Sequence, residues 1–527
     1  MKKKTMQHTL ALLTALLLVS LANLDAAEPR PNILVIYTDD QGFGDASCYN
    51  PQSKIQTPNL DKLAAGGMRF TDAHCSDTVC TPSRYGLLTG RYSWRTTLKR
   101  GVFGAERPCL IADGRMTLAS LCRDHGYATA MVGKWHLGMD FPGDEGARDW
   151  SQPVKDMPLD KGFDYFFGIP ASLNYGVLAW FEGRFAKVPP TVFTKKKPNQ
   201  LNPGDYRIMP PYEPKLAGNL MEVAPDFVDD QCLTRFTDKA IEYIHGRAKA
   251  TDGKPFFLYL PYTSPHLPVI PLEQFRGKSG CGAYGDFMME TDWHIGRVMD
   301  ALEAGGMTRN TLIVFSSDNG PENPWRERIK QHQHYSSGPY RGGKRSIYEG
   351  GHRVPFIVRW PEVVKPGSVW DGLVCQSDLL ATFADILGVK LPDNAGEDSV
   401  SFHGALTGKA GSKERLPVIH HASNGRFAVR EGKWKLIMEH ANAQCELYDL
   451  DADPGENTNI LAQHADIASR LTERITVIVQ KGRTTPGADQ ANDTGWWDDL
   501  AWIPGKGSSP KMKKKGNKRA AADPVAP

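Results

Sequence analysis

Ile-Leu-Val-Ile-Tyr-Thr-Asp-Asp, residues 33–40, is a short apolar run that ends in two carboxylates. Its β-branched residues predict a buried strand whose carboxyl end carries polar side chains. Similar runs follow at 128–132, 256–260, 312–315 and 356–358, and helical stretches lie at 57–66, 117–125, 225–247 and 285–305. This alternation predicts an α/β fold with a large mixed, mostly parallel sheet sandwiched by helices.

Two regions do not show this alternation of strands and helices. Residues 141–223 are dense in Pro, Gly, Lys and aromatics without clear periodicity, which predicts long loops that shape a substrate pocket. Short strands expected at 426–430, 433–438 and 446–450, followed by a helix at 465–480, predict a smaller C-terminal α+β unit. The expected divisions are a signal peptide, 1–27; a catalytic domain, 28–392; a C-terminal α+β subdomain, 393–485; and a low-complexity basic tail, 486–527.

The N-terminus has the order of a secretory signal. Three lysines at 2–4 precede an apolar run at 10–21 and small residues at 26–27. The run is shorter than the roughly 20 residues of a membrane span, so we expect an exported chain, periplasmic or secreted, without a stable membrane anchor. A single glycosylation sequon at Asn492 favours a bacterial source.

Charge and cysteine content narrow the functional classes further. The formal charge is +3, but lysines gather at both ends of the chain, so the body between them is acidic and no nucleic-acid partner is expected. Nine cysteines show no CxxC spacing, which argues against zinc, and their odd number leaves at least one unpaired.

Polar residues follow the predicted strands where the carboxyl ends of parallel strands would meet. Singly, an Asp pair is as typical of a turn or a helix cap. Together, four oxygen donors suit a hard divalent cation, Ca²⁺ or Mg²⁺, and three cations suit a tetrahedral oxyanion. The oxygen donors are Asp39, Asp40, Asp318 and Asn319, and the cations are Arg84, Lys134 and Lys344. A helix expected to open at Pro82 would add its N-terminal dipole beside Cys80.

Two longer motifs carry a resemblance to a known family. Cys80-Thr81-Pro82-Ser83-Arg84 through Gly90-Arg91, and Gly126-Tyr127-Ala128-Thr129 through Gly133-Lys134-Trp135-His136-Leu137-Gly138, resemble both signatures of the formylglycine-dependent (type I) sulfatases. These arylsulfatase-like enzymes belong to the alkaline phosphatase superfamily. The similarity extends to Gly342-Gly343-Lys344, Tyr348-Glu349-Gly350-Gly351 and Glu446-Leu447-Tyr448-Asp449-Leu450, and so covers nearly the whole chain.

The resemblance implies a mechanism for sulfate-ester hydrolysis. Cys80 would be converted to formylglycine by a formylglycine-generating enzyme, and the hydrated aldehyde would attack sulfur. Asp39, Asp40, Asp318 and Asn319 would bind Ca²⁺ together with the residue derived from Cys80. Arg84 and Lys134 would stabilise the hydrate, and Lys344 would hold sulfate oxygens. His136 would take a proton during sulfate release, and His266 would protonate or orient the leaving oxygen.

Other interpretations remain open at this point. The same superfamily contains phosphodiesterases and phosphonate hydrolases, and a non-catalytic binder of sulfated glycans would keep Cys80 unmodified. The expected substrate is a sulfated carbohydrate or an aryl sulfate. His332, His334, His420 and His421 are expected at the surface or in contact with substrate. Four tryptophans could stack on sugars or pack in the core: Trp135, Trp180, Trp325 and Trp360.

Overall fold

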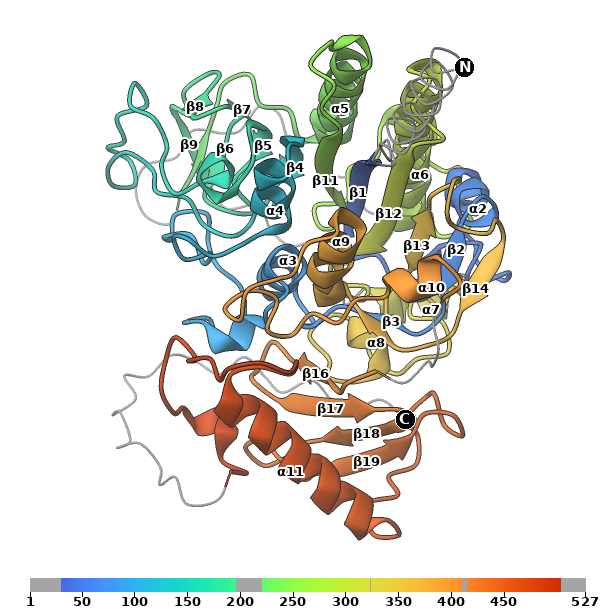
Figure 1. Ribbon diagram of the computed structural model, residues 1–527. Coiled ribbons are helices and arrows are strands. Elements are labelled where there is room, and N and C mark those ends of the chain that lie inside the picture. Colours follow the sequence, from blue (N-terminus) through green and yellow to red (C-terminus); the bar gives the residue numbers. More distant parts are fainter. Residues whose placement is uncertain (1–29, 196–219, 323, 410–414, 504–527) are drawn as a thin grey trace, which may run out of the picture.

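The computed structural model describes residues 30–195, 220–322, 324–409 and 415–503. A ten-stranded sheet forms the centre of the molecule (Figure 1). Its order is β14 (Ser368–Trp370), β2 (Met68–Phe70), β13 (Phe356–Arg359), β12 (Thr311–Ser317), β1 (Asn32–Asp39), β11 (Phe256–Pro265), β4 (Ala128–Lys134), β5 (Tyr165–Ile169), β7 (Phe181–Glu182) and β8 (Phe185–Ala186). Strands β12, β1, β11, β4 and β5 are parallel, whereas β13, β7 and β8 pair antiparallel with their neighbours. The predicted mixed, mostly parallel sheet is confirmed.

Helices cover the sheet on both faces (Figure 1). In one group, α6 (Gly282–Ala304) contacts both α2 (Pro58–Ala65) and α5 (Cys232–Lys249). A second group is α3 (Cys80–Thr89), α4 (Leu118–Asp124) and α9 (Leu379–Leu387). Strand β1 is buried along nearly all of its length because it lies in the middle of these layers. This double burial explains why its sequence is continuously apolar rather than alternating.

The C-terminal unit is a four-stranded antiparallel sheet with a helix against it (Figure 1). The strands are β16 (Val418–His421), β17 (Phe427–Glu431), β18 (Trp434–Ile437) and β19 (Glu446–Asp449), and α11 (Ala465–Lys481) packs on β17 and β18. The predicted α+β unit is confirmed, but strand β16 was not predicted. Its sequence, Val-Ile-His-His, ends in two residues that interrupt the apolar pattern.

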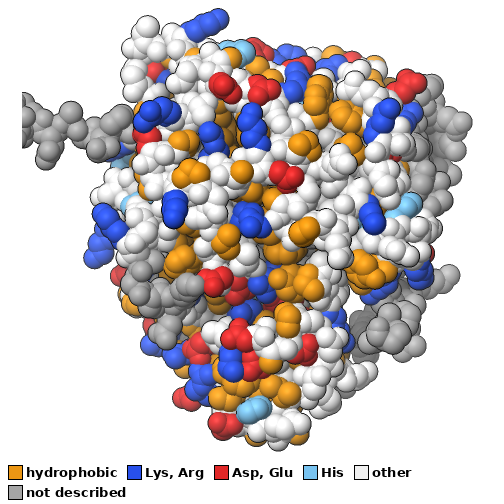
Figure 2. Space-filling model, turned by 90° about the vertical axis from the view of Figure 1, so that its right-hand side faces the viewer, with side chains coloured by type: hydrophobic (Ala, Val, Ile, Leu, Met, Phe, Trp, Pro, Cys, Tyr) orange, Lys and Arg blue, Asp and Glu red, His pale blue; other side chains and the backbone are white. Residues whose placement is uncertain are grey.

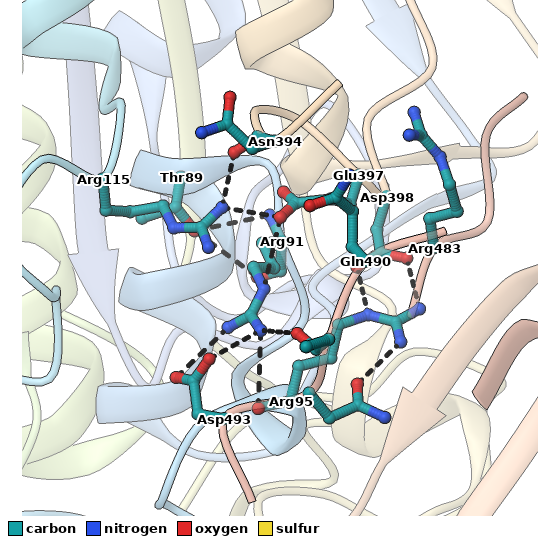
Figure 3. Close-up of polar contacts among 12 residues, drawn as sticks. Thr89, Arg91, Arg95, Arg115, Asn394, Glu397, Asp398, Arg483, Gln490 and Asp493 are labelled. Carbon is teal, nitrogen blue, oxygen red and sulfur yellow. Dashed lines mark hydrogen bonds and ion pairs between the residues drawn. The ribbon is translucent and has the colours of Figure 1, made fainter. Parts of the chain in front are cut away.

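Ion pairs connect residues beyond position 392 to the large unit (Figure 3). Arg95 lies 2.8 Å from Asp398, Arg91 lies 2.9 Å from Asp493, and Arg115 lies 2.6 Å from Glu397. Beyond them, three residues are buried against the C-terminal core: Leu500, Trp502 and Ile503. The basic tail predicted from residue 486 is therefore wrong for 486–503. Trp and Leu side chains in this stretch supply the apolar surface that packs on the core.

The region 141–223 also differs from the loops predicted for it. It contributes three strands to the main sheet, and its β6 (Val177–Leu178), β10 (Leu220–Val223) and β9 (Val192–Lys195) form a separate sheet. Most of these strands have two to four residues, too few to show a readable period. The helix predicted from 225 begins at Cys232, after a 3₁₀ turn at Asp229–Gln231.

The remaining elements are short. They are β3 (Ala73–His74), which pairs with β15 (Val374–Cys375), and α7 (Trp325–His332), α8 (Glu349–His352) and α10 (His403–Leu406). All nine cysteines are free thiols. The predicted signal peptide at 1–27 and residues 504–527 lie outside the described residues.

The surface carries mixed charge. On the face shown in Figure 2, acidic, basic and hydrophobic side chains are interspersed rather than gathered by type. Among the described residues, no helix is long and apolar enough to cross a bilayer.

Candidate active site

The tips of β1 and β12 bring four predicted residues together. The two strands are parallel and in register, with Thr38 opposite Ser317, so the residues that follow each strand are neighbours. The Asp40 backbone N–H donates to Asp318 Oδ1 at 3.1 Å, and the Asn319 amide donates to Asp40 Oδ1 at 2.7 Å. Asp40 has φ 69°, a left-handed conformation that Asp tolerates better than most side chains. The turn directs oxygen atoms from both strands into one buried site.

Three buried cations balance these carboxylates. Lys134, at the end of β4, contacts Asp39 directly. Arg84, from α3, donates to Asp318 Oδ2 through Nη2 at 2.8 Å and Nε at 3.1 Å. Lys344 Nζ lies 2.7 Å from Asp40 Oδ2. Because every partner is buried, removing one charge would leave its partner uncompensated.

The charges shift one another's protonation. Burial alone would raise the pKa of Asp39, but Lys134, His266 and Arg84 outweigh it and hold that pKa below its ordinary value. Burial and the neighbouring Asp39 raise the pKa of Asp318. Burial opposes the charge of Lys344, yet Asp40 and other anions raise its pKa well above the ordinary value. The site therefore keeps Asp39 ionised and Lys344 protonated.

Cys80 is the first residue of helix α3, so the helix begins two residues before the predicted start at Pro82. It lines a cavity of ≈ 350 Å³ together with Tyr175, His266 and Lys344. Burial raises the pKa of the Cys80 thiol to about 12, even with Lys134 and Lys344 nearby. Since the thiolate is the reactive form, the unmodified side chain would be a poor nucleophile at neutral pH.

The oxygen atoms fit a bound cation. Ligand atoms of Asp39, Asp40, Cys80 and His266 lie within 4.8 Å of one another. In the described part of the chain, Asp39 Oδ1 and Asn319 Oδ1 are buried without a hydrogen-bond partner. Orphaned carboxylate and amide oxygens suit a hard divalent ion. Asp318 lies beside this group, with Arg84 and the Asp40 N–H on its two oxygens.

The two predicted histidines have assignable tautomers. His136 Nε2 lies 3.0 Å from the Phe103 carbonyl oxygen, which can only accept, so Nε2 carries the proton. His136 Nδ1 is then a buried acceptor, and no described residue bonds to it. His266 Nδ1 donates to the Leu267 carbonyl at 2.6 Å, and its Nε2 lies 3.7 Å from Asp40 Oδ2. Each ring thus has one nitrogen fixed by the backbone and the other available for proton transfer.

Several residues lie elsewhere than the sequence predicted. His334, His420 and His421 are buried, so a surface or substrate contact is wrong for them. His334 Nε2 bonds to Asp45 Oδ1 at 2.7 Å, and His421 Nδ1 bonds to Asp77 Oδ1 at 3.0 Å. His332 is half-buried at the end of α7. Among the tryptophans, Trp135, Trp180 and Trp360 are buried and Trp325 is half-buried.

The cavity also contains residues that sequence reasoning missed. Asn174 and Tyr175 line it from the segment before β6, and Glu322 and Arg345 form an ion pair at its edge. Only Arg345 gave a usable signal, because it adjoins Lys344. The other three lie in stretches whose backbone path could not be predicted.

Comparison with known proteins agrees with this geometry. The sulfatase family model matches residues 31–389, and a model described as the C-terminal part of N-sulphoglucosamine sulphohydrolase matches 341–481. The chain belongs to the sulfatase family. It is 34% identical to N-acetylgalactosamine-6-O-sulfatase of Bacteroides thetaiotaomicron over 481 residues, covering 84% of this chain and 92% of the relative. It is also 34% identical to human arylsulfatase A over 480 residues, with 85% and 86% covered.

Solved structures of other proteins share the fold of this sulfatase. A structure from Bacteroides thetaiotaomicron, described under the metabolism of glycosaminoglycans, has a TM-score of 0.74 and 33% identity, and covers 86% of this chain and 99% of its own. A phosphonate monoester hydrolase from Silicibacter pomeroyi, with a TM-score of 0.57 and 18% identity, shares the fold alone. The protein is thus a sulfuric ester hydrolase, as predicted.

Proposed function

We propose that this sulfatase releases sulfate from a sulfated carbohydrate, with Cys80, converted to formylglycine, as the residue that attacks sulfur. The observation that carries the proposal is the position of Cys80 at the N-terminus of α3, with ligand atoms of Asp39, Asp40 and His266 within 4.8 Å. The converted side chain, as its hydrate, would supply the attacking oxygen. A divalent cation, Ca²⁺ in preference to Mg²⁺, would polarise the reacting oxygens when held by Asp39, Asp40, Asp318 and Asn319.

The choice of a carbohydrate rests on relatives and on the shape of the site. One relative is named for a sulfated sugar, N-acetylgalactosamine 6-O-sulfate, and another for aryl sulfates. A larger cavity shares Tyr175 with the cavity at Cys80, so there is room nearby for more than the sulfate group. Simple aryl sulfates would be accepted because the fixed charges gather around the sulfate itself.

The side chains of the site have separable tasks. Arg84 and Lys134 are held by Asp318 and Asp39, and they would place positive charge beside the residue at position 80. Lys344, which lines the cavity together with Cys80, would bind a sulfate oxygen.

The two histidines would handle protons. His136 Nδ1, the buried acceptor, would take the proton released when sulfate leaves. His266 Nδ1 is held as a donor by the Leu267 carbonyl, so Nε2 would orient the leaving oxygen as an acceptor in the neutral ring and protonate it only when the ring carries both protons.

Maturation and location complete the proposal. We propose export through a signal peptide at 1–27, to the periplasm or the medium, and modification of Cys80 by a formylglycine-generating enzyme. The helix start at Cys80 leaves the thiol buried in the fold, so conversion would precede folding of this segment.

Two measurements test the function together. Matured protein should hydrolyse an aryl sulfate at least about 100-fold faster than an aryl phosphate diester, and the peptide containing residue 80 should have the mass of the aldehyde rather than the thiol. A preference for the phosphate diester would point to a phosphodiesterase. An unmodified Cys80 in a protein that binds sulfated glycans without turnover would point to a non-catalytic binder.

Cation binding gives a prediction that does not depend on turnover. Adding Ca²⁺ to chelator-treated protein should raise the melting temperature, since a ligand at 100 times its Kd stabilises the folded state by about 2.7 kcal/mol. Mg²⁺ at the same concentration should have a smaller effect. In Asp39→Asn the Ca²⁺ response should be largely lost. An equal response in the variant and the wild type would place the ion elsewhere.

A further inference from the structure

A second cavity adjoins the one at Cys80. It has a volume of ≈ 900 Å³, and Tyr175 lines both cavities. Glu106 stands close to their junction. A Cβ atom at Gly176 would lie only 1.4 Å from Glu106 Oε1, so this carboxylate rests directly on the backbone beside Tyr175. The two cavities therefore lie on either side of Tyr175, and a substrate held at Cys80 that extends past Tyr175 would reach the larger one.

The two cavities have opposite charge. Lys344, Arg345 and His266 line the smaller one, with Glu322 as the acidic partner. The larger cavity is lined by four carboxylates, those of Glu106, Asp140, Asp144 and Glu145.

Among the described residues, Arg148 is the cation that lines the larger cavity, and its guanidinium already has partners. Arg148 Nε lies 3.2 Å from Glu222, its Nη1 donates to the Gly143 carbonyl at 2.8 Å, and its guanidinium covers the Phe141 ring. Arg148 is therefore paired with Glu222, and the lining that the described residues provide is negative.

We propose that the larger cavity binds the sugar next to the sulfated one, and that it selects a sugar that is neutral or carries an amine. This inference rests on the proposed function and specifies its substrate. Ionised carboxylates only accept hydrogen bonds, and sugar hydroxyl and ammonium groups are the matching donors. A second sulfate or a carboxylate in this cavity would be repelled by the carboxylates. Such repulsion discriminates against a substrate even where the matching attraction adds little affinity for the preferred one.

The test uses three aryl sulfates that share one flexible linker para to the ester and differ only at its end: hydroxyl, carboxylate or ammonium. The wild type should show kcat/KM at least about tenfold higher for the ammonium probe than for the carboxylate probe, with the hydroxyl probe between them. In Glu106→Gln/Asp144→Asn/Glu145→Gln the ratio should fall to about twofold. Glu273→Gln, an exposed carboxylate outside the cavity, should keep the wild-type ratio.

The unsubstituted aryl sulfate separates the two proposals. If the wild type does not hydrolyse it, the proposed function fails. If it is hydrolysed equally by the wild type and the triple variant, the sulfate site is intact and the probe ratios report on the larger cavity alone. A carboxylate probe that reacts as fast as the ammonium probe, or a ratio that the triple variant leaves unchanged, overturns the inference.

Discussion

Sulfate release by a Cys80→Ala variant is expected to be roughly 10⁴-fold slower than by the matured wild type. Alanine offers no sulfur-bearing carbon for conversion to an aldehyde, and therefore no oxygen to attack sulfur. The substitution leaves the surrounding charges in place and puts a good helix former at the first position of α3. The loss should therefore appear in kcat/KM for an aryl sulfate, with little change in the melting temperature.

The matched control is Cys122→Ala. Cys122 is equally buried, on α4, and burial raises the pKa of its thiol as it does at Cys80. This variant removes the same atoms from a position outside the cavity, so its kcat/KM should equal that of the wild type. Turnover by Cys80→Ala within tenfold of the wild type would show that the residue at position 80 does not supply the nucleophile.

The convergence of the site could be predicted from the sequence because it follows from one property of parallel sheets. Asp39 and Asp318 each come directly after an apolar run, and parallel strands end at the same edge. Lys134 follows from the same rule at the end of β4. The structure brings these side chains together with Cys80. That Cys80 belongs to the site was predicted from its sequence motif rather than from the strand pattern.

What the sequence could not predict depends on backbone geometry between strands. The tautomer of His136 is set by the Phe103 carbonyl, and a carbonyl leaves no signature in the sequence. Tyr175 enters the cavity from a segment that read as loop. Strand pairing that the sequence does not reveal also matters. His420 was expected at the surface, but it lies on β16 and is buried.

That interior position belongs to a cluster of three buried histidines from separate elements: His74 on β3, His352 on α8 and His420 on β16. His352 Nε2 lies 3.0 Å from Lys435 Nζ and 3.1 Å from the Ile347 carbonyl oxygen, and His352 Nδ1 lies 2.9 Å from His74 Nδ1. His74 Nε2 donates to Asp72 at 2.8 Å. The two facing Nδ1 atoms share one proton, so the two rings cannot both be charged.

Charged side chains of both signs surround the histidine cluster. The facing groups are the anions Asp72, Glu349 and Glu456 and the cations Lys435, Arg353 and Arg430. The His420 ring stacks on His352 at 3.7 Å, and neither of its nitrogens bonds to a described residue. Burial, with the neighbouring cations and rings, lowers the pKa of all three histidines.

Acid should therefore destabilise the fold steeply. An unfolded histidine takes up a proton near pH 6.5, whereas these three resist it when folded, so their contribution is complete above pH 6.5 and is lost as the pH falls below it. Burial raises the pKa of Glu456 to about 7, which acts in the opposite direction by one proton. The net difference of two protons corresponds to roughly 3 kcal/mol per pH unit.

The pH dependence of urea unfolding between pH 7 and pH 5 includes this contribution, and His420→Phe tests its origin. Phenylalanine keeps the stack on His352 and removes one titrating ring without breaking a hydrogen bond, so the slope should decrease by about 1.4 kcal/mol per pH unit. His245→Gln, an exposed residue on α5, should keep the wild-type slope. A slope that His420→Phe leaves unchanged would assign the acid sensitivity to other groups, because this substitution alters the proton count of the cluster while preserving its packing.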